Sequence, residues 1–414
     1  MSDSSDPLTA CEEFVFLCSS YHRHPKEEYL NKLRVLRPTD WPRIFSLMNA
    51  HHLNGYLWFH LEPISKELPA EINRKMTAEY SWAMGKDFIQ GAALEQLCSA
   101  LSDSDLPFAA VKGPLSHRWI YGEIPISRGS ADLDVLIFGE EKQLSDAVRI
   151  VESLDFRFQP RFPLTWQEHW KIDHDLPFIK TGVEENPIAL ELLRTPSNFH
   201  LKGDSAGRLL QWLRGQCRPV PWNSYRTQTA HSCPGLSPAG HIIYLSINLL
   251  KDGKPQIYLV NDMACLIERH GTEIDWEDVF GIAHRTGLTT AMAVSLGLVE
   301  RFRGIRLPVR YRKTVLSLAL GSDLQVPNVL RRPQEIEQGI SGAEEIRMSL
   351  LNCPALAFGW GVFLEWWISF ERQRARASSE YLSSRPLYFM KRIGVLPMRM
   401  IGILSRVIHG KAKG

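Results

Sequence analysis

The sequence has few cysteines, and they are not arranged as in a metal site or a disulfide framework. Seven cysteines are spread over 414 residues, with no C-x-x-C pair and no histidine spacing suited to zinc. This pattern argues against a zinc site. An odd, dispersed set of cysteines is typical of a reducing compartment in which most thiols are buried.

The sequence also lacks a long hydrophobic run and a secretory signal. The apolar stretch 355–370 has only 16 residues and contains Glu365, so it is too short to span a bilayer easily, and we predict a buried helix there. The first residues, MSDSSDPLTACEEF, are acidic and polar, unlike a signal peptide. We therefore expect a cytoplasmic protein.

The chain has little excess of charge of either sign, but basic and acidic residues are unevenly distributed along it. The net charge is +2, yet residues 372–414 alone carry +9, which leaves −7 for the remainder. As a helix, 398–410 would place Arg399 and Arg406 on one side and Ile401, Leu404 and Ile408 on another. Two interpretations stay open: peripheral contact with an anionic membrane, or packing of the apolar side on the protein core, which we favour.

The pattern of apolar and polar residues changes twice along the chain. Residues 10 to about 100 have helical periodicity, and the region from SPAGHIIYLSINLL (237) onward is helical again. Between them, short apolar runs (LPFAAVK, DLDVLIF, LPFIK and IALELLR) alternate with helical segments and turns. We predict an α+β fold with a small mixed-sheet core at 105–200, a helical region at 1–104, and a second helical region at 201–414 with a basic tail from about 372.

Two aspartates interrupt the second of these apolar runs. In a strand, Asp132 and Asp134 share one face and their Cα atoms lie about 7 Å apart. Two like charges so placed repel, and a divalent cation such as Mg²⁺, which prefers oxygen ligands, would relieve the repulsion. An isolated D-x-D of solvated aspartates is common by chance, so the interpretation depends on the surrounding residues.

Three features around the pair favour phosphate chemistry. Lys112 and Gly113 end one strand and open a helix, where backbone N–H groups attract phosphate. Arg128 is suited to a phosphate or carboxylate. Glu191 is a lone acid in IALELLR, and if that strand pairs with DLDVLIF, three carboxylates meet on one sheet face. Such a triad suits two metals that clamp the oxygens of a phosphoryl displacement. The P-loop pattern G-x-x-x-x-G-K-[ST] is missing, which disfavours a Walker-type kinase or ATPase.

At these positions the sequence resembles the uncharacterised nucleotidyltransferases of the DNA-polymerase-β-like superfamily. The resemblance consists of an apolar strand ending in Lys-Gly, a helix with a tyrosine near its end, and Arg-x-x-x-Asp-hydrophobic-Asp. The residues that carry it are Lys112, Gly113, Tyr121, Arg128, Asp132 and Asp134. The flanks DWPRIFSLMNAHHLNGYLWFHL and LVNDMACLIERHGTEIDWEDVFGIAHRTGL also fit, so the resemblance covers most of 35–310.

The sequence departs from the superfamily pattern at two places. The usual Gly-Ser lies closer to the aspartates than Gly113 does, and Gly129-Ser130 lies too close; we take Gly113 as the phosphate-loop glycine and Ser130 as a lesser candidate. The third position often reads acid-hydrophobic-His, but Leu193 stands here. The role of that histidine is either absent or taken by His174. Arg194 is equally open as a phosphate ligand or a surface arginine.

The resemblance implies a metal-dependent nucleotidyltransferase that moves a nucleoside monophosphate from an NTP and releases pyrophosphate. Asp132, Asp134 and Glu191 would bind Mg²⁺ or Mn²⁺, and Lys112, Gly113, Arg128 and Ser130 would bind the nucleotide. The acceptor is open: a sugar, a lipid-linked glycan, a peptide or a protein. Nothing in the sequence indicates sequence-specific nucleic-acid binding. The alternatives are a catalytically inactive relative that binds nucleotide or a partner, and an adaptor at a membrane surface.

Overall fold

The fold was analysed in a computed structural model of the chain. It describes residues 8–122, 132–159, 165–172, 175–181, 187–196, 205–223, 230–251 and 256–308, together with 124, 126, 127, 129, 130, 310–312, 315 and 329. Within these residues, no helix combines the length and apolar character needed to cross a membrane. The stretch 355–370 and the basic tail lie outside the described residues, so their predictions stay predictions.

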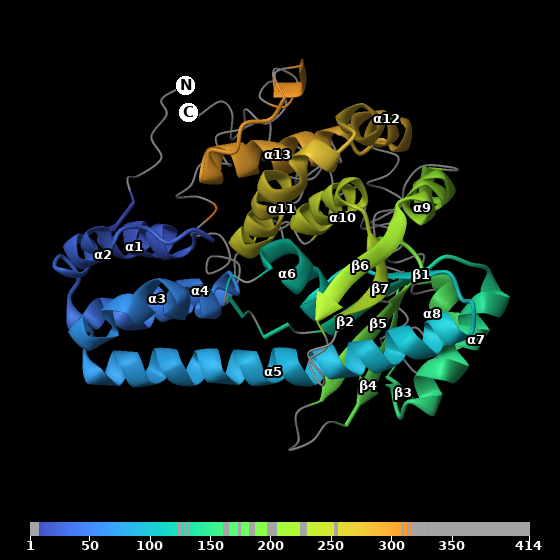
Figure 1. Cartoon of the computed structure of the whole chain (residues 1–414), viewed down its shortest axis with the longest axis horizontal. Coiled ribbons are helices and arrows are strands. Elements are labelled where there is room, and N and C mark those ends of the chain that lie inside the picture. Colours follow the sequence, from blue (N-terminus) through green and yellow to red (C-terminus); the bar gives the residue numbers. More distant parts are fainter. Residues whose placement is uncertain are drawn as a thin grey trace, which may run out of the picture.

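The N-terminal region is helical, as predicted. Its longest element, α5 (Ala70–Asp103), spans 34 residues and runs the length of the molecule, first under the other N-terminal helices and then across the sheet (Figure 1). The elements before it are α1 (Ala10–Cys18), α2 (Lys26–Leu33), η1 (Pro38–Asp40), α3 (Trp41–Ala50), α4 (Asn54–Leu61) and η2 (Glu62–Glu67).

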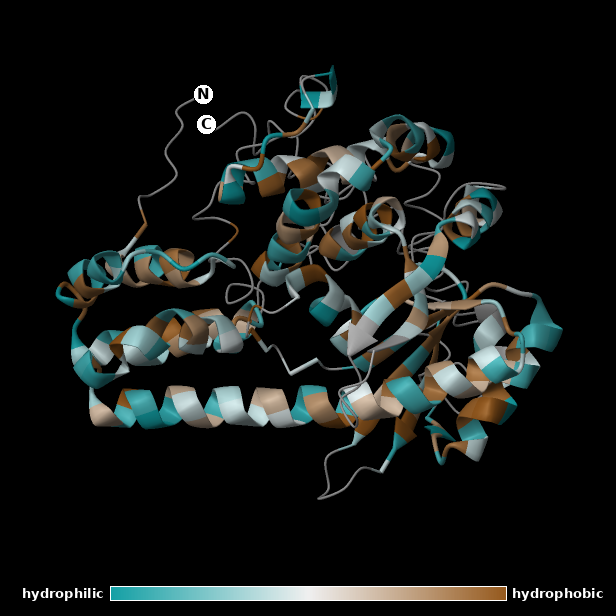
Figure 2. Ribbon diagram, viewed as in Figure 1, coloured by the Kyte–Doolittle hydropathy of each residue, from teal (hydrophilic) through white to brown (hydrophobic). Residues whose placement is uncertain are grey.

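One stripe of α5 faces the interior. Ala83, Leu94, Leu97 and Leu101 are buried at the three- and four-residue spacing of a helical face. Colouring by hydropathy shows the rest of this helix as a mixture of polar and apolar residues, whereas the central strands are largely apolar (Figure 2). The same buried stripe contains Asp87, a charged residue at a position where the pattern calls for an apolar one.

A seven-stranded mixed sheet forms the centre of the fold, with strand order β3-β4-β5-β2-β1-β7-β6. β2 pairs in parallel with β5 and antiparallel with β1, and β1 pairs in parallel with β7. The strands are β1 (Phe108–Ala110), β2 (Asp132–Ile137), β3 (Arg157–Phe158), β4 (Asp175–Lys180), β5 (Ile188–Leu193), β6 (Cys217–Asn223) and β7 (Ala230–Leu236). The predicted α+β fold with a mixed sheet is confirmed.

Among the described residues, four α-helices connect these strands. The two predicted between the first strands are present as α6 (Gly113–Tyr121) and α7 (Glu141–Ser153), and α8 (Trp166–Ile172) and α9 (Ser205–Gly215) follow. α7 begins with a capping box between Glu140 and Gln143, and its apolar positions Leu144, Ala147, Val148 and Val151 are buried. The amphipathic pattern of 140–154 thus corresponds to a helix whose apolar side is buried.

The second helical region follows β7. Its elements are α10 (Pro238–Lys251), α11 (Ile257–His270), η4 (Gly271–Glu273), α12 (Trp276–Thr286) and α13 (Thr289–Arg303). Asp275 caps the start of α12, since its side chain accepts hydrogen bonds from the backbone N–H groups of Glu277 and Asp278. The division at residue 200 stays a prediction; β6 and β7, which join the sheet, both follow that residue.

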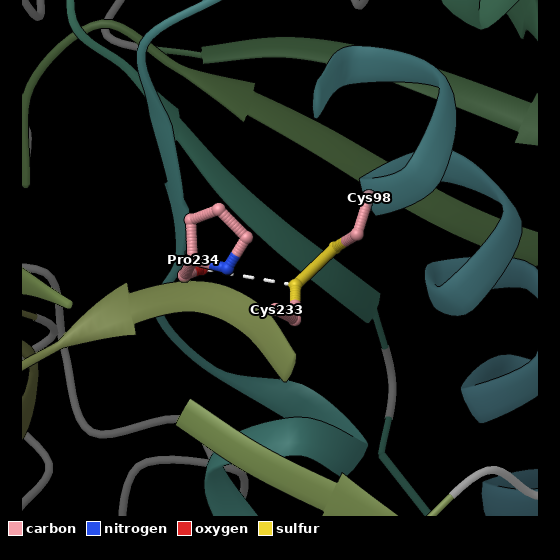
Figure 3. Close-up of a disulfide and its surroundings, with 3 residues drawn as sticks. All are labelled: Cys98, Cys233 and Pro234. Atoms are coloured by element: carbon pink, nitrogen blue, oxygen red, sulfur yellow. Dashed lines mark hydrogen bonds between the residues drawn. A yellow bond between two sulfur atoms is a disulfide. The ribbon is translucent and has the colours of Figure 1, made fainter. Parts of the chain in front are cut away.

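Two cysteines are joined by a disulfide, although the scattered spacing indicated free thiols. Cys98 of α5 and Cys233 of β7 are bonded across 135 residues of sequence, with their Cα atoms 6.2 Å apart (Figure 3). Of the four cysteines described as free, Cys11, Cys18 and Cys265 are buried, in agreement with the expectation for thiols. The bond ties the long helix to the strand beside β1, and β1 leads directly into Lys112.

Candidate active site

Three carboxylates meet where β2 and β5 pair. The parallel register places Asp134 directly opposite Glu191 and Asp132 opposite Ala189. Carboxylate oxygens of Asp132, Asp134 and Glu191 all lie within 4.8 Å of one another. The strand pairing on which the sequence-based triad depended is therefore present, and all three acids project from one face of the sheet.

The alternation of residues in both strands explains why the acids share a face. Leu133 and Val135 of β2, like Leu190 and Leu192 of β5, are fully buried on the opposite face. A shift of either strand by one residue would exchange these leucines and valines with the carboxylates, so the hydrophobic core holds the register. The packing of apolar side chains thus brings three mutually repelling groups together.

Lys112 is the basic residue that the described structure places at this cluster. The Val111 N–H donates to the carbonyl oxygen of Asp134, which continues the strand pairing up to Lys112. The Lys112 ammonium then lies 2.9 Å from Asp134 Oδ2, with the two side chains 17% and 2% exposed. Burial lowers the pKa of Lys112, but the neighbouring Asp134, followed by Tyr244 and Asp132, outweighs it and raises the pKa well above the usual value.

The excess of negative charge at the cluster affects the pKa of Glu191. Burial, and then the charges of Asp134, Asp175 and Asp132, raise its pKa from 4.5 to about 8, against the opposing effect of Lys112. A proton is thus held at a position where a divalent cation would interact with all three acids. Hard oxygen donors at this spacing fit Mg²⁺ or Mn²⁺. The donor set therefore suits the metal expected from the sequence.

Next to the carboxylates, α6 begins at Gly113, as predicted. Gly113 has φ +76°, a conformation that favours glycine, and a Cβ built on it would lie 3.3 Å from the Asp132 carbonyl oxygen. Among the described residues, the Lys112 side chain makes no capping hydrogen bond to this helix. The start of α6, with the helix dipole behind it, therefore lies beside the acids, and of its first residues Pro114 has no backbone N–H to offer.

The far end of α6 is fixed by hydroxyl groups. The Tyr121 hydroxyl donates to Asp262 Oδ1 of α11 at 2.8 Å and lies 2.6 Å from the Tyr56 hydroxyl of α4. Tyr56 and Tyr121 are fully buried, and Asp262 is 3% exposed. The tyrosine of the sequence motif thus anchors α6, the helix that begins beside the carboxylates.

The structure describes some of the other site residues considered in the sequence and not others. The Ser130 N–H donates to Asp87 of α5 at 3.0 Å, so this residue is tied to the long helix. Leu193 is buried, and Arg194 donates to the Trp170 carbonyl oxygen at 2.7 Å, which favours its structural interpretation. Arg128 and His174 lie outside the described residues.

Comparison with known families adds the decisive observation. A family described as "Uncharacterised nucleotidyltransferase" matches residues 37–304, well over half of the chain. The chain belongs to this family. No curated protein matches the sequence. The matched range contains Lys112, Asp132, Asp134 and Glu191, and it also contains α4, α5 and all helices from α6 to α13.

In this member of the nucleotidyltransferase family, three site residues were missed by sequence reasoning. Asp175 of β4 is fully buried and acts electrostatically on Glu191. Tyr244 of α10 is buried, and burial, followed by the charge of Asp134, raises the pKa of its hydroxyl well above the usual value. Asp87 binds the segment before β2. Asp87 alone left a signal in the sequence, because it is a charged residue on an otherwise uncharged helix stripe.

Proposed function

We propose that the protein is a metal-dependent nucleotidyltransferase that transfers a nucleoside monophosphate from an NTP to an acceptor hydroxyl or phosphate. The observation that carries the proposal is the cluster of three carboxylates within 4.8 Å, with Lys112 2.9 Å from Asp134. Asp132, Asp134 and Glu191 would hold Mg²⁺ or Mn²⁺. The bound metal would supply charge neutralisation for the transferred phosphoryl group and the pyrophosphate leaving group.

The residues around the cluster have separate tasks in this proposal. The start of α6 and Lys112 hold the triphosphate, because the helix end offers N–H donors and the lysine a mobile positive charge. In the protein alone, the Lys112 ammonium partly neutralises Asp134. On binding, the ammonium exchanges this carboxylate for a phosphate oxygen. Glu191 loses its proton in the loaded state and takes the proton of the acceptor hydroxyl or serves as a metal ligand.

Release of pyrophosphate tests the proposal directly. The protein is incubated with Mg²⁺ or Mn²⁺ and each of the four ribonucleoside triphosphates, carrying an α-phosphate label, in the presence of cell extract. We expect pyrophosphate release that chelation of the metal stops, and transfer of the label to a single class of acceptor. Metal-independent release, or none with any of the triphosphates, would contradict it.

The second candidate is an inactive relative that binds nucleotide, and the observation that favours it is Leu193. This buried leucine occupies the position at which the resemblance implies a histidine. NTP binding without pyrophosphate release, under conditions in which an extract supplies acceptors, would select this candidate over the enzyme.

Lys112→Ala is expected to raise the KM for NTP about 10-fold or more, because a hydrogen bond to a charged phosphate is lost. The value of kcat should change less. Pyrophosphate release measured against NTP concentration at saturating Mg²⁺ separates the two constants. Lys142→Ala, at an exposed position on α7, is the matched control. A KM that stays at the wild-type value would remove Lys112 from the triphosphate site.

The acceptor class is tested through the basic tail, whose membrane contact stays a prediction. Each lysine or arginine near an anionic surface contributes about 1 kcal/mol. If the full chain sediments with anionic vesicles at low salt and a chain ending at Ser384 does not, lipid-linked acceptors become the leading substrates. If neither chain sediments, or the shortened chain is insoluble, the tail belongs to the fold and a soluble acceptor is favoured.

A further inference from the structure

The segment that leads into β2 is held from outside the sheet. We call residues 127–130 the entry loop; the structure describes Ser127, Gly129 and Ser130 of it. The loop ends two residues before Asp132, so its position determines where the first metal-binding carboxylate lies. None of the sheet interactions described above reaches this loop, since β2 begins at Asp132.

One side of the entry loop is bound by Asp87 of α5. The Ser127 hydroxyl donates to Asp87 Oδ2 at 2.6 Å, and the Ser130 N–H donates to Asp87 Oδ1 at 3.0 Å. Asp87 is 6% exposed and Ser127 is 1% exposed, so the hydrogen bond between their side chains lies away from water, and the bond from the Ser130 N–H is partly buried. A buried carboxylate that accepts two such bonds spans the loop from end to end and fixes its length and direction.

The helices also confine the loop by contact. A Cβ built on Gly55 of α4 would lie 1.6 Å from the Ser127 carbonyl oxygen, so only glycine leaves room for the loop there. Gly129 has φ +58° and lies against α5, where a Cβ would meet the Ala83 Cα at 3.1 Å. The described residues of the entry loop are therefore enclosed by α4 and α5, with the Asp87 carboxylate as their polar attachment.

The contacts of the entry loop support the start of β2, where the three carboxylates gather. Asp132, Asp134 and Glu191 repel one another, and the strand start is the part of β2 with the least support from the sheet. Binding constellations need their supporting groups held to within about 0.5 Å. α5, which carries Asp87, packs against both β2 and β5, the strands that bear the three carboxylates.

We propose that Asp87 and Gly55 are positioning residues that hold the entry loop so that Asp132 and Asp134 are placed for metal binding, and that the N-terminal helices are thereby part of the active site. The inference rests on the proposed function. Asp87 touches neither metal nor substrate in this scheme; it acts through Ser127 and Ser130. An isolated sheet core without α4 and α5 would lack this support.

The test uses the full chain and two readouts. Mn²⁺ affinity is measured by titration calorimetry, and kcat and KM are measured by pyrophosphate release. Loss of groups that orient metal ligands costs about 10- to 100-fold in metal affinity or activity, and we expect a loss in that range for Asp87→Ala. Asp87→Asn keeps an acceptor for the Ser130 N–H and a polar partner for Ser127, so it should restore most of the affinity. In both Asp87 variants, the KM for NTP should change by a smaller factor than kcat.

Further variants separate positioning from general stability. Gly55→Ala pushes on the loop from the other side and should weaken Mn²⁺ binding as Asp87→Ala does. Ser127→Ala removes one of the two bonds and keeps the test usable if Asp87→Ala does not fold. Leu94→Ala, at a fully buried position on the same helix, is the control for lost stability. Assayed below its unfolding temperature, it should bind Mn²⁺ like the wild type.

Wild-type Mn²⁺ affinity and kcat in Asp87→Ala, or in Ser127→Ala together with Gly55→Ala, would overturn the inference while leaving the proposed function intact. An equal loss in Leu94→Ala would overturn it as well, because stability alone would then explain the effect. A wild-type chain that neither binds Mn²⁺ nor releases pyrophosphate would instead overturn the proposed function, and this inference with it.

Discussion

Asp132→Asn and Asp134→Asn are each expected to lower the rate of pyrophosphate release by about 10³-fold or more and to weaken Mn²⁺ binding. The metal's neutralisation of charge in phosphoryl transfer is worth several kcal/mol, and each 1.36 kcal/mol corresponds to a factor of ten in rate. Either substitution removes one of the three carboxylates that lie within 4.8 Å of one another. Both variants should fold, since asparagine has nearly the shape of aspartate.

The two variants should differ in stability without metal, although the sequence alone treats them alike. Neutralising Asp132 relieves repulsion in the cluster, so the unfolding midpoint of the metal-free protein should stay equal or rise. Asp134 is paired with Lys112 at 2.9 Å, and both are largely buried. Removing one partner of a buried pair costs about 3–5 kcal/mol, an effect that Asp132 and Glu191 offset only in part. The midpoint of Asp134→Asn should therefore fall.

Thermal unfolding with and without Mn²⁺, followed by kinetics at saturating NTP, measures both effects. Asp146→Asn is the matched control, since this aspartate lies on the surface of α7 and pairs with Arg149. It should retain wild-type rate and metal affinity. Near-wild-type turnover in either site variant would rule out a mechanism that depends on both aspartates. Equal midpoints for the two site variants would show that the Lys112 ion pair adds nothing to stability.

The sequence predicted much of this site because its geometry is local or follows from strand alternation. Asp132 and Asp134 are two residues apart, so any strand puts them on one face. Gly113 opens a helix directly after an apolar run, and this requires no knowledge of the tertiary fold. Glu191 depended on one long-range assumption, the pairing of β5 with β2, and the register confirms it. The family match supports the resemblance drawn from these residues.

The features that escaped prediction depend on contacts between distant segments. Asp175 reaches the site because β4 pairs antiparallel with β5, a choice of neighbour that its own sequence does not encode. Cys98 and Cys233 are bonded because α5 crosses the sheet next to β7, and their spacing of 135 residues carries no signal. Asp87 was detectable only as a charge in an apolar stripe, and nothing local identifies the loop that it binds.

Glu191→Gln is expected to lower kcat about 10²-fold or more with a smaller change in the KM for NTP. General acid–base groups contribute about 10²–10⁴-fold to a rate. Removal of a metal ligand that acts in the transition state likewise lowers kcat more than it changes KM. Glutamine keeps the size of the side chain and removes its charge. Steady-state pyrophosphate release at several NTP concentrations separates kcat from KM. If the variant turns over like the wild type, the third carboxylate lies elsewhere, and Glu184 and Glu185, outside the described residues, are the next to test.

The same variant should change how the stability of the metal-free protein depends on pH. The Glu191 pKa is about 8 in the folded protein, raised by burial and then by Asp134, and its ordinary value is 4.5. The folded state thus holds this proton more tightly than the unfolded state does. The contribution of this proton to the free energy of unfolding is fully present below about pH 4.5 and is lost as the pH rises through about 8. Relative to Glu191→Gln, which cannot ionise, the wild-type midpoint should fall across this window.

Added Mn²⁺ distinguishes the origin of that loss. If the loss comes from crowding of carboxylates, saturating Mn²⁺ at pH 8 should restore the wild-type midpoint and leave Glu191→Gln far less affected, because one ligand is missing. Asp175→Asn should reduce the pH dependence by a smaller amount, since Asp175 is a neighbouring charge of Glu191 and ranks behind Asp134 in raising its pKa. Parallel curves for wild type and Glu191→Gln between pH 5 and 8 would show that Glu191 is already ionised at pH 5. Crowding of the carboxylates would then not hold a proton on Glu191 in the metal-free protein.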